Sequence, residues 1–183
     1  MRIVKQYNYM QMDKRIEIKS VRDEDCLHVS GYASMFGICD FHNDIIEKGA
    51  FSKAISNKNI KLLWQHEQKE PIGKITKIFE DNKGLFIEAK ITKGTIKGRE
   101  AADLVSKGII NGLSIGFNVS KSYTNPSGSR VITEADLWEV SIVTFPANRQ
   151  SEIITCKNEM GDIKQNISIE ILENLKQLNE VFK

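Results

Sequence analysis

The sequence predicts a mainly β domain, in which an antiparallel barrel or sandwich is accompanied by two or three helices. Three observations lead to this class. Short apolar runs, many of them alternating with polar residues, recur along most of the chain and are separated by turn residues. Strands and helices do not alternate regularly, as they would in a parallel α/β sheet. The 183 residues, 40% of them hydrophobic, are enough for the core of one domain.

The N-terminal third is expected to be mostly extended. Alternating residues predict two strands within residues 15–33, where Leu27 and Val29 are separated by polar side chains. The polar stretch of residues 36–48 predicts a loop, and residues 49–55 predict a short helix.

The next segment carries a histidine at the end of a predicted strand. Residues 60–66 are expected to be extended, which would place Leu62, Trp64 and His66 on one face. Proline and glycine at residues 71–73 then predict a turn.

The middle of the chain contains a hairpin and a helix. Residues 72–80 and 84–91 are expected to pair across a turn of Asp, Asn, Lys and Gly at 81–84. Residues 95–107 have an apolar helical side and are followed by Gly108, so they predict a helix that ends at this glycine.

Two more strands are expected after this helix. Residues 113–119 alternate, residues 124–129 form a turn-rich loop, and residues 131–145 are a long β-prone run that Pro146 ends. A short apolar segment follows at residues 152–154.

The composition changes near residues 155–166, which are polar. Residues 167–182 carry apolar side chains at helical spacing. We therefore expect one folded domain over residues 1–155, and a linker with an amphipathic C-terminal helix over residues 156–183.

The charge balance argues against several classes of partner. There are 26 basic and 24 acidic residues, so nothing predicts a nucleic-acid or membrane partner. No apolar run is long enough to cross a bilayer, and the first residues lack the apolar stretch of a signal peptide. Three widely spaced cysteines, Cys26, Cys39 and Cys156, are typical of reduced thiols. We expect a soluble protein of the cytoplasm.

Residues 112–116 read Gly-Leu-Ser-Ile-Gly, the G-x-S-x-G pattern of serine hydrolases with Ser114 at its centre. In α/β-hydrolases the histidine follows the serine, which lies on a turn between strand and helix. Here His28, His42 and His66 all precede Ser114, and the residues after it alternate like a strand. The pattern therefore marks either a tight strand with no catalytic role or a nucleophile in a different architecture.

A serine nucleophile needs a base, and the base needs a group that orients it. His66 is the best candidate base. Glu139 lies in an apolar run, where a buried carboxylate requires a partner, and an imidazole would serve. Two alternatives stay open: Glu139 is a charge that protects a sheet edge, or another acid such as Asp136 takes its role.

Cys26, His28, Cys39 and His42 form a rival set of zinc-type ligands. The Cys-x-His spacing, with one residue between the ligands, departs from that of common zinc sites, in which two to four residues separate paired ligands. We therefore expect no metal and no cofactor.

Five segments, in this order, resemble the prohead proteases of tailed bacteriophages, the HK97-like family of capsid maturation proteases. The resemblance covers about residues 15–155. The segments are GYASMF at 31–36, DIIEKGAF at 44–51, LLWQH at 62–66, GLSIGF at 112–117 and LWEVSIVTFPAN at 137–148.

The resemblance implies a fold related to herpesvirus assemblins, a closed antiparallel β-barrel of about seven strands surrounded by helices. It implies a serine endopeptidase that acts inside the phage procapsid, in the cytoplasm of the bacterial host. Its substrates would be scaffold segments, typically the delta region of the major capsid protein precursor, and the protease itself. Self-association into a dimer or larger assembly is expected. The alternative is a catalytically silent scaffolding module with the same fold.

The resemblance also implies roles for individual residues. Ser114 would be the nucleophile and His66 the general base, while Glu139 occupies the place of a second histidine in the herpesvirus relatives. The oxyanion would be held by backbone N–H groups of the segment after the Glu139 strand, namely Ala147, Asn148 and Arg149.

Overall fold

The computed structural model describes residues 25–56 and 59–158. The first predicted strand, before residue 25, and the C-terminal helix at 167–182 lie outside the described residues. The elements in chain order are β1 (Cys26–Met35), β2 (Asp44–Ile46), the 3₁₀ turn η2 (Ala54–Ser56), β3 (Lys61–Trp64), β4 (Glu67–Glu80), β5 (Gly84–Thr92), α1 (Ile96–Ser106), β6 (Gly112–Thr124), β7 (Arg130–Val143) and β8 (Ile153–Asn158).

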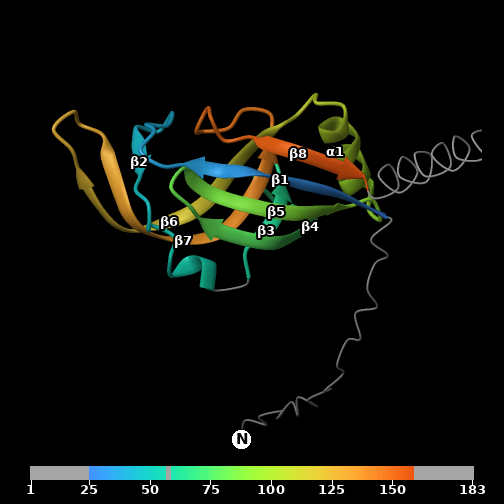
Figure 1. Ribbon diagram of the computed structural model, residues 1–183, viewed down its shortest axis with the longest axis horizontal. Helices are drawn as coiled ribbons and strands as arrows, with labels where there is room; N and C mark the ends of the chain where they lie inside the picture. The colour runs from blue at the N-terminus through green and yellow to red at the C-terminus, as the bar shows by residue number, and fades with distance from the viewer. Residues whose placement is uncertain (1–24, 57–58, 159–183) are drawn as a thin grey trace, which may run out of the picture.

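All the strands belong to one strongly curled sheet (Figure 1). The order is β2-β7-β3-β4-β5-β1-β8, and β6 pairs with β7. Between β6 and the segment leading into β8, the described residues form a single isolated bridge, Gly112 with Glu152. The sheet is therefore an open half-barrel, and the expected closed barrel surrounded by helices is not what forms. Within the described residues the helical elements are α1 and η2.

Two strand pairs are parallel, against the expectation of an antiparallel sheet. β2 and β3 both run parallel to β7, each along a different part of it. Parallel neighbours need a long connection, and the chain supplies one by building β4, β5, α1 and β6 between β3 and β7. β2 lies within residues 36–48, which we expected to be a loop, and three residues are too few for an alternating pattern to show.

The best local predictions concern α1 and the hairpin of β4 and β5. The Thr95 side chain caps α1 by accepting a hydrogen bond from the Gly98 N–H, and the chain leaves the helix at Gly108, whose φ is +66°. The β4–β5 hairpin is antiparallel, as expected. Residues 49–55 do not form an α-helix but a series of turns that ends in η2.

The expected turn at residues 71–73 is wrong. β4 begins at Glu67 and continues through Pro71, which is paired with Leu63 where the register between β3 and β4 shifts. A proline is tolerated at such an irregular position because it has no N–H to give to a regular ladder. β8 also continues to Asn158, beyond residue 155, where we expected the linker to begin.

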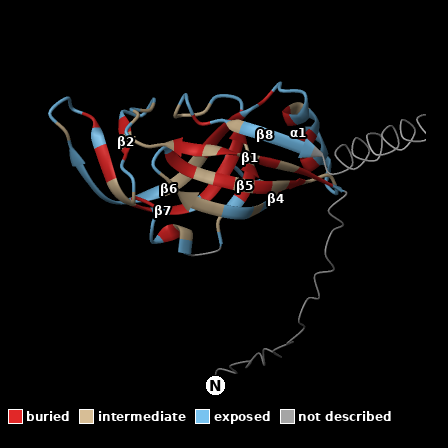
Figure 2. Cartoon of the chain, in the orientation of Figure 1, coloured by how far each residue is buried: buried red, intermediate tan, exposed pale blue. Residues whose placement is uncertain are grey.

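The buried residues, red in Figure 2, lie along the strands of the curled sheet and on α1. Most of them form one hydrophobic cluster, in which most side chains are aliphatic. Ala101 and Ala102 of α1 are buried against them. Ile142 of β7 and Leu113 of β6 are completely buried, which fixes the two strands that carry the site described below. Within the described residues, no helix has the length and apolar character needed to span a bilayer.

Candidate active site

The register of β6 and β7 places four small or polar residues together. Ser114 is opposite Ser141, and Gly116 is opposite Glu139. Directly opposed residues of an antiparallel pair project to the same face, so these four share one patch of the sheet. Glu139 and Ser141 are fully buried, whereas Ser114 keeps 6% of its surface exposed.

The two glycines of the G-x-S-x-G pattern make room for this arrangement. A Cβ on Gly116 would lie 2.8 Å from Glu139 Cγ, and one on Gly112 would lie 2.9 Å from Pro146 Cδ. Both distances are too short for real carbon contacts. Ser114 lies within β6 and not on a turn between strand and helix, so the α/β-hydrolase architecture is absent, as the order of the histidines predicted.

A β-bulge precedes the acid. The pairing of β6 with β7 passes from Gly116–Glu139 to Phe117–Leu137, so Trp138 has no partner in the ladder. Bulges change the direction of neighbouring side chains. Here Trp138 is 38% exposed while the next residue, Glu139, is completely buried.

The pattern of Leu62 and Trp64 predicts that His66 lies on the same strand, and this prediction is wrong. β3 ends at Trp64, and Gln65 and His66 form the two-residue turn into β4, with φ values of 51° and 62°. Positive φ at both central residues is typical of a type I′ turn, which normally contains asparagine or glycine. This turn brings the imidazole within hydrogen-bonding distance of Glu139.

A short hydrogen bond joins the base and the acid. His66 Nδ1 is 2.6 Å from Glu139 Oε1, and because the carboxylate can only accept, Nδ1 carries the proton. The other oxygen, Oε2, accepts a hydrogen bond of 2.7 Å from Ser141 Oγ. The bond to Glu139 raises the pKa of His66 above its usual 6.5, although partial burial of the ring opposes this. Glu139, and not Asp136, is the acid that contacts His66.

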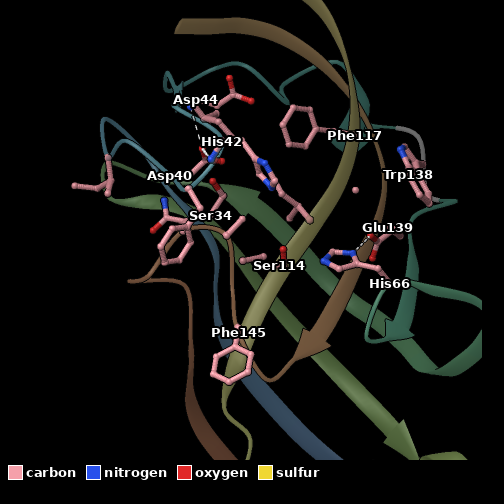
Figure 3. Close-up of a pocket in the computed structure, with 18 residues that line it drawn as sticks. Ser34, Asp40, His42, Asp44, His66, Ser114, Phe117, Trp138, Glu139 and Phe145 are labelled. Carbon is pink, nitrogen blue, oxygen red and sulfur yellow. Dashed lines mark hydrogen bonds and ion pairs between the residues drawn. The ribbon is translucent and has the colours of Figure 1, made fainter. Parts of the chain in front are cut away.

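Ser114, His66 and Glu139 line one cleft of about 540 Å³. Figure 3 shows the His66 ring between Ser114 and Glu139. Both Ser114 and His66 lie within the described part of the chain, and no hydrogen bond joins their side chains. Phe145, which is 88% exposed, and Trp138 border the cleft. Its other lining residues are Ala33, Ser34, Ile38, Asp40, Phe41, His42, Asp44, Ile46, Ile115, Gly116, Phe117, Ala147 and Asn148.

The segment after β7 forms part of the same cleft. Ala147 and Asn148 line it, whereas the Arg149 guanidinium lies 4.5 Å from the centre of the Phe41 ring. No described residue accepts a hydrogen bond from the backbone N–H groups of Ala147, Asn148 and Arg149. These three donors are therefore available within the described part of the chain.

The rival zinc ligands are dispersed. Cys26 is buried in β1, while Cys39 Sγ contacts the Asn43 side chain and His42 lines the cleft. Nowhere in residues 25–56 and 59–158 do three or more His, Cys, Asp or Glu side chains gather in a way that could hold a metal ion.

Sequence reasoning missed the residues that hold the base and the acid in place. Ser141 contacts both, and the Gln65 side chain makes two hydrogen bonds with Thr144. One signal could have identified Ser141: it lies two positions after Glu139 in an apolar run, and therefore on the same face of the strand.

Residues 14–166 match the model of the caudovirus prohead serine proteases. The chain belongs to this family. The family assignment made from the order of the five segments is thus confirmed, and with it the assignment to the phage proteases of capsid maturation.

Curated relatives agree with this family. The chain is 35% identical to the prohead protease of enterobacteria phage HK97 over 150 residues, which are 79% of this chain and 67% of the relative. It is 28% identical to the prohead protease of Escherichia phage T5 over 149 residues, 79% of this chain and 70% of the relative. It is also 34% identical to the capsid polyprotein of Pseudomonas phage PAJU2, but covers 22% of that longer chain.

Solved structures with a similar fold are proteases as well. The bacteriophage T4 capsid assembly protease matches with a TM-score of 0.51 at 12% identity, covering 63% of this chain and 82% of that one. The KSHV protease in complex with a hexapeptide phosphonate inhibitor matches with a TM-score of 0.50 at 13% identity, covering 70% and 64%. At these identities the likeness concerns the fold alone, and it confirms the predicted similarity in fold to herpesvirus proteases.

Proposed function

We propose that this prohead protease is a serine endopeptidase in which Ser114 is the nucleophile, His66 the general base and Glu139 the residue that orients the base. The observation that carries the proposal is the 2.6 Å bond between His66 and a fully buried Glu139 in the cleft that also holds Ser114. A buried carboxylate on Nδ1 leaves Nε2 as the basic nitrogen, as serine activation requires.

In the proposed reaction Ser114 Oγ attacks the carbonyl carbon of the scissile peptide, and its proton passes to His66 Nε2. The tetrahedral intermediate collapses, the C–N bond breaks, and the leaving amine takes the proton from Nε2. Water then repeats the sequence on the acyl-enzyme and releases the acid. Glu139 holds the imidazole in the correct tautomer and stabilises the imidazolium in both halves.

The nucleophile and the base are not hydrogen-bonded in the free protein. Such contacts are often loose without substrate and tighten in the Michaelis complex. We propose that the contact between Ser114 Oγ and His66 Nε2 forms when a peptide fills the cleft.

We propose that the backbone amides of Ala147, Asn148 and Arg149 stabilise the developing oxyanion. Their support is that they lie on the segment that borders the cleft and donate to no described residue. The Arg149 side chain stacks on Phe41, so its role here would be limited to its amide.

The substrates are proposed from the family and from the names of relatives. We propose that the protease cleaves scaffold segments, including the delta region of the major capsid protein precursor, and itself. It would do so as a dimer or larger assembly within the procapsid, in the cytoplasm of the host. The catalytic domain would comprise residues 1–155, extended by β8 to 158, with a linker and an amphipathic helix after it.

The proposal is tested by Ser114→Ala, with Ser129→Ala as a matched control. Ser129 is 7% exposed, close to the 6% of Ser114, but lies outside the cleft. Cleavage of a capsid-protein precursor, followed by gel electrophoresis, should fall at least about 10⁴-fold in the first variant and stay unchanged in the second. Full cleavage by a folded Ser114→Ala protein would reject Ser114 as the nucleophile.

Labelling with a fluorophosphonate separates the enzyme from a silent scaffolding module. We expect one label on Ser114 of the wild type, located by peptide mass spectrometry, and none on Ser114→Ala. A wild-type protein that assembles with capsid protein but neither cleaves it nor takes the label would support the silent module.

A further inference from the structure

Ser141 makes two hydrogen bonds that meet at one atom. Its Oγ donates to Glu139 Oε2 at 2.7 Å and accepts from the backbone N–H of His66 at 3.1 Å. We infer that Ser141 is a positioning residue of this site, which fixes the orienting carboxylate and the turn that carries the base at the same time. This inference rests on the function proposed above.

The carboxylate end of this link sets the direction of Glu139. The terminal torsion of a glutamate side chain has a broad energy profile, so one hydrogen bond does not hold the plane of its carboxylate. With His66 on Oε1 and Ser141 on Oε2, both oxygens have a partner and the plane is defined. Because Glu139 is completely buried, loss of the Ser141 donor would leave a buried carboxylate oxygen without this hydrogen bond, which is costly.

The other end sets the position of the imidazole. Gln65 and His66 both have positive φ, a conformation that side-chain-bearing residues keep only when their surroundings impose it. Ser141 holds the amide of His66, while the Gln65 amide donates to the Ile142 carbonyl at 3.0 Å. The Gln65 side chain adds two bonds to Thr144. The turn is thus bonded to Ser141 and Ile142 of β7 and to Thr144 just after it.

A hydroxyl is suited to this position because it donates and accepts through one small atom. Ser141 is also completely buried, so its side chain cannot reach a bound peptide. It acts through Glu139 and His66 and is not itself a catalytic residue.

Kinetics test the inference with three variants of the full chain. Ser141→Ala removes both bonds, Ser141→Cys fills similar space with a weak donor, and Ser129→Ala removes a buried hydroxyl that donates to Asn43 Oδ1 at 2.9 Å. We expect kcat to fall about 10- to 100-fold in Ser141→Ala, as for other residues that orient a functional group. KM should stay within about twofold. Ser141→Cys should lie between this variant and the wild type, and Ser129→Ala should match the wild type.

Nuclear magnetic resonance provides a readout that needs no activity. In a Ser114→Ala background, which prevents self-cleavage, the Nδ1 proton of His66 should give a downfield resonance that exchanges slowly. Adding Ser141→Ala should broaden or remove this resonance, whereas adding Ser129→Ala should leave it. Circular dichroism establishes that each variant is folded at the temperature used, and Ser141→Cys replaces Ser141→Ala if the latter unfolds.

Two results would overturn the role of Ser141. One is a folded Ser141→Ala protein with the kcat of Ser129→Ala. The other is a Ser141→Ala variant whose Nδ1 resonance is unchanged and whose cleavage falls only in proportion to the fraction of protein that is unfolded. If instead the wild type proves inactive, the proposed function fails, and the resonance still decides whether Ser141 positions His66.

Discussion

The two ends of β7 carry the same arrangement of elements but different chemistry. At one end the short strand β2 runs parallel to Arg130–Ile132, in the part of the β6–β7 hairpin that projects from the body (Figure 1). At the other, the short strand β3 runs parallel to Glu139–Ile142, within the sheet. Each end buries one carboxylate that lines the cleft, Asp44 with 4% exposure and Glu139 with none.

The partner of each carboxylate makes the difference. Asp44 receives two hydrogen bonds from the Arg130 guanidinium, at 2.7 and 2.5 Å, and this raises the already high pKa of Arg130 further. Glu139 receives one bond from an imidazole that gains and loses a proton near neutral pH. A permanently charged partner makes a clamp between strands, whereas a titratable partner with a free second nitrogen can transfer protons.

The largest expected effect that tests this comparison is that of Glu139→Gln. The amide keeps the size of the side chain, but its NH₂ group can donate to Nδ1 and stabilise the wrong tautomer of His66. We expect kcat to fall about 10³- to 10⁴-fold, as in serine proteases whose orienting acid becomes an amide. The measurement is cleavage of a precursor peptide under saturating conditions.

The pH profile of the same variant provides its control. In the wild type the acidic limb of kcat/KM should lie above pH 6.5, because the hydrogen bond to Glu139 raises the pKa of His66. Without the carboxylate this limb should move to lower pH. An acidic limb that stays in place would mean that Glu139 does not control the protonation of His66.

A smaller effect, on stability, is expected from Asp44→Asn at the other end. The asparagine side chain is neutral, so the attraction between opposite charges is lost. Its NH₂ group also faces a guanidinium N–H, and two donors cannot bond to each other. Because the Arg130 side chain is 51% exposed and remains hydrated, we expect a loss of about 1–2 kcal/mol in the free energy of unfolding, measured in urea.

A double-mutant cycle with Arg130→Gln tests whether this loss belongs to the pair. If the two losses of unfolding free energy add up in the double mutant, Asp44 and Arg130 do not stabilise each other. The ion pair would then not hold β2 and β7 together.

The sequence predicted best those parts of the molecule that depend on local chemistry. Thr95 and Gly108 delimit α1 because a cap and a left-handed exit need particular residues. The β4–β5 hairpin was found from turn residues next to alternating runs. The parallel strands β2 and β3 were not recognised as such, because their pairing with β7 depends on contacts across more than 70 residues of chain.

The same division holds within the candidate site. A buried acid in an apolar run required a partner, and His66 is that partner. The turn that presents His66 could not be predicted, because Gln65 and His66 are not residues that favour positive φ. Hydrogen bonds to β7 support the turn, and these include the one from the His66 N–H to Ser141, which depends on the parallel pairing of β3 with β7.

The smallest expected effect concerns how stability depends on pH at the two ends. The pKa of His66 is raised in the folded protein, so the Glu139–His66 pair contributes stability that is complete below the unfolded value of 6.5 and is lost as the pH rises through the folded value. The gap in unfolding free energy between the wild type and His66→Gln should therefore shrink from pH 6 to pH 8.5. Because the His66 side chain is 44% exposed, the change should stay below about 1 kcal/mol.

The gap in unfolding free energy between the wild type and Asp44→Asn should stay constant over this range, because a guanidinium does not titrate there. Equal pH dependence of the two gaps, measured by urea unfolding, would remove the distinction between a titratable pair and a permanent clamp.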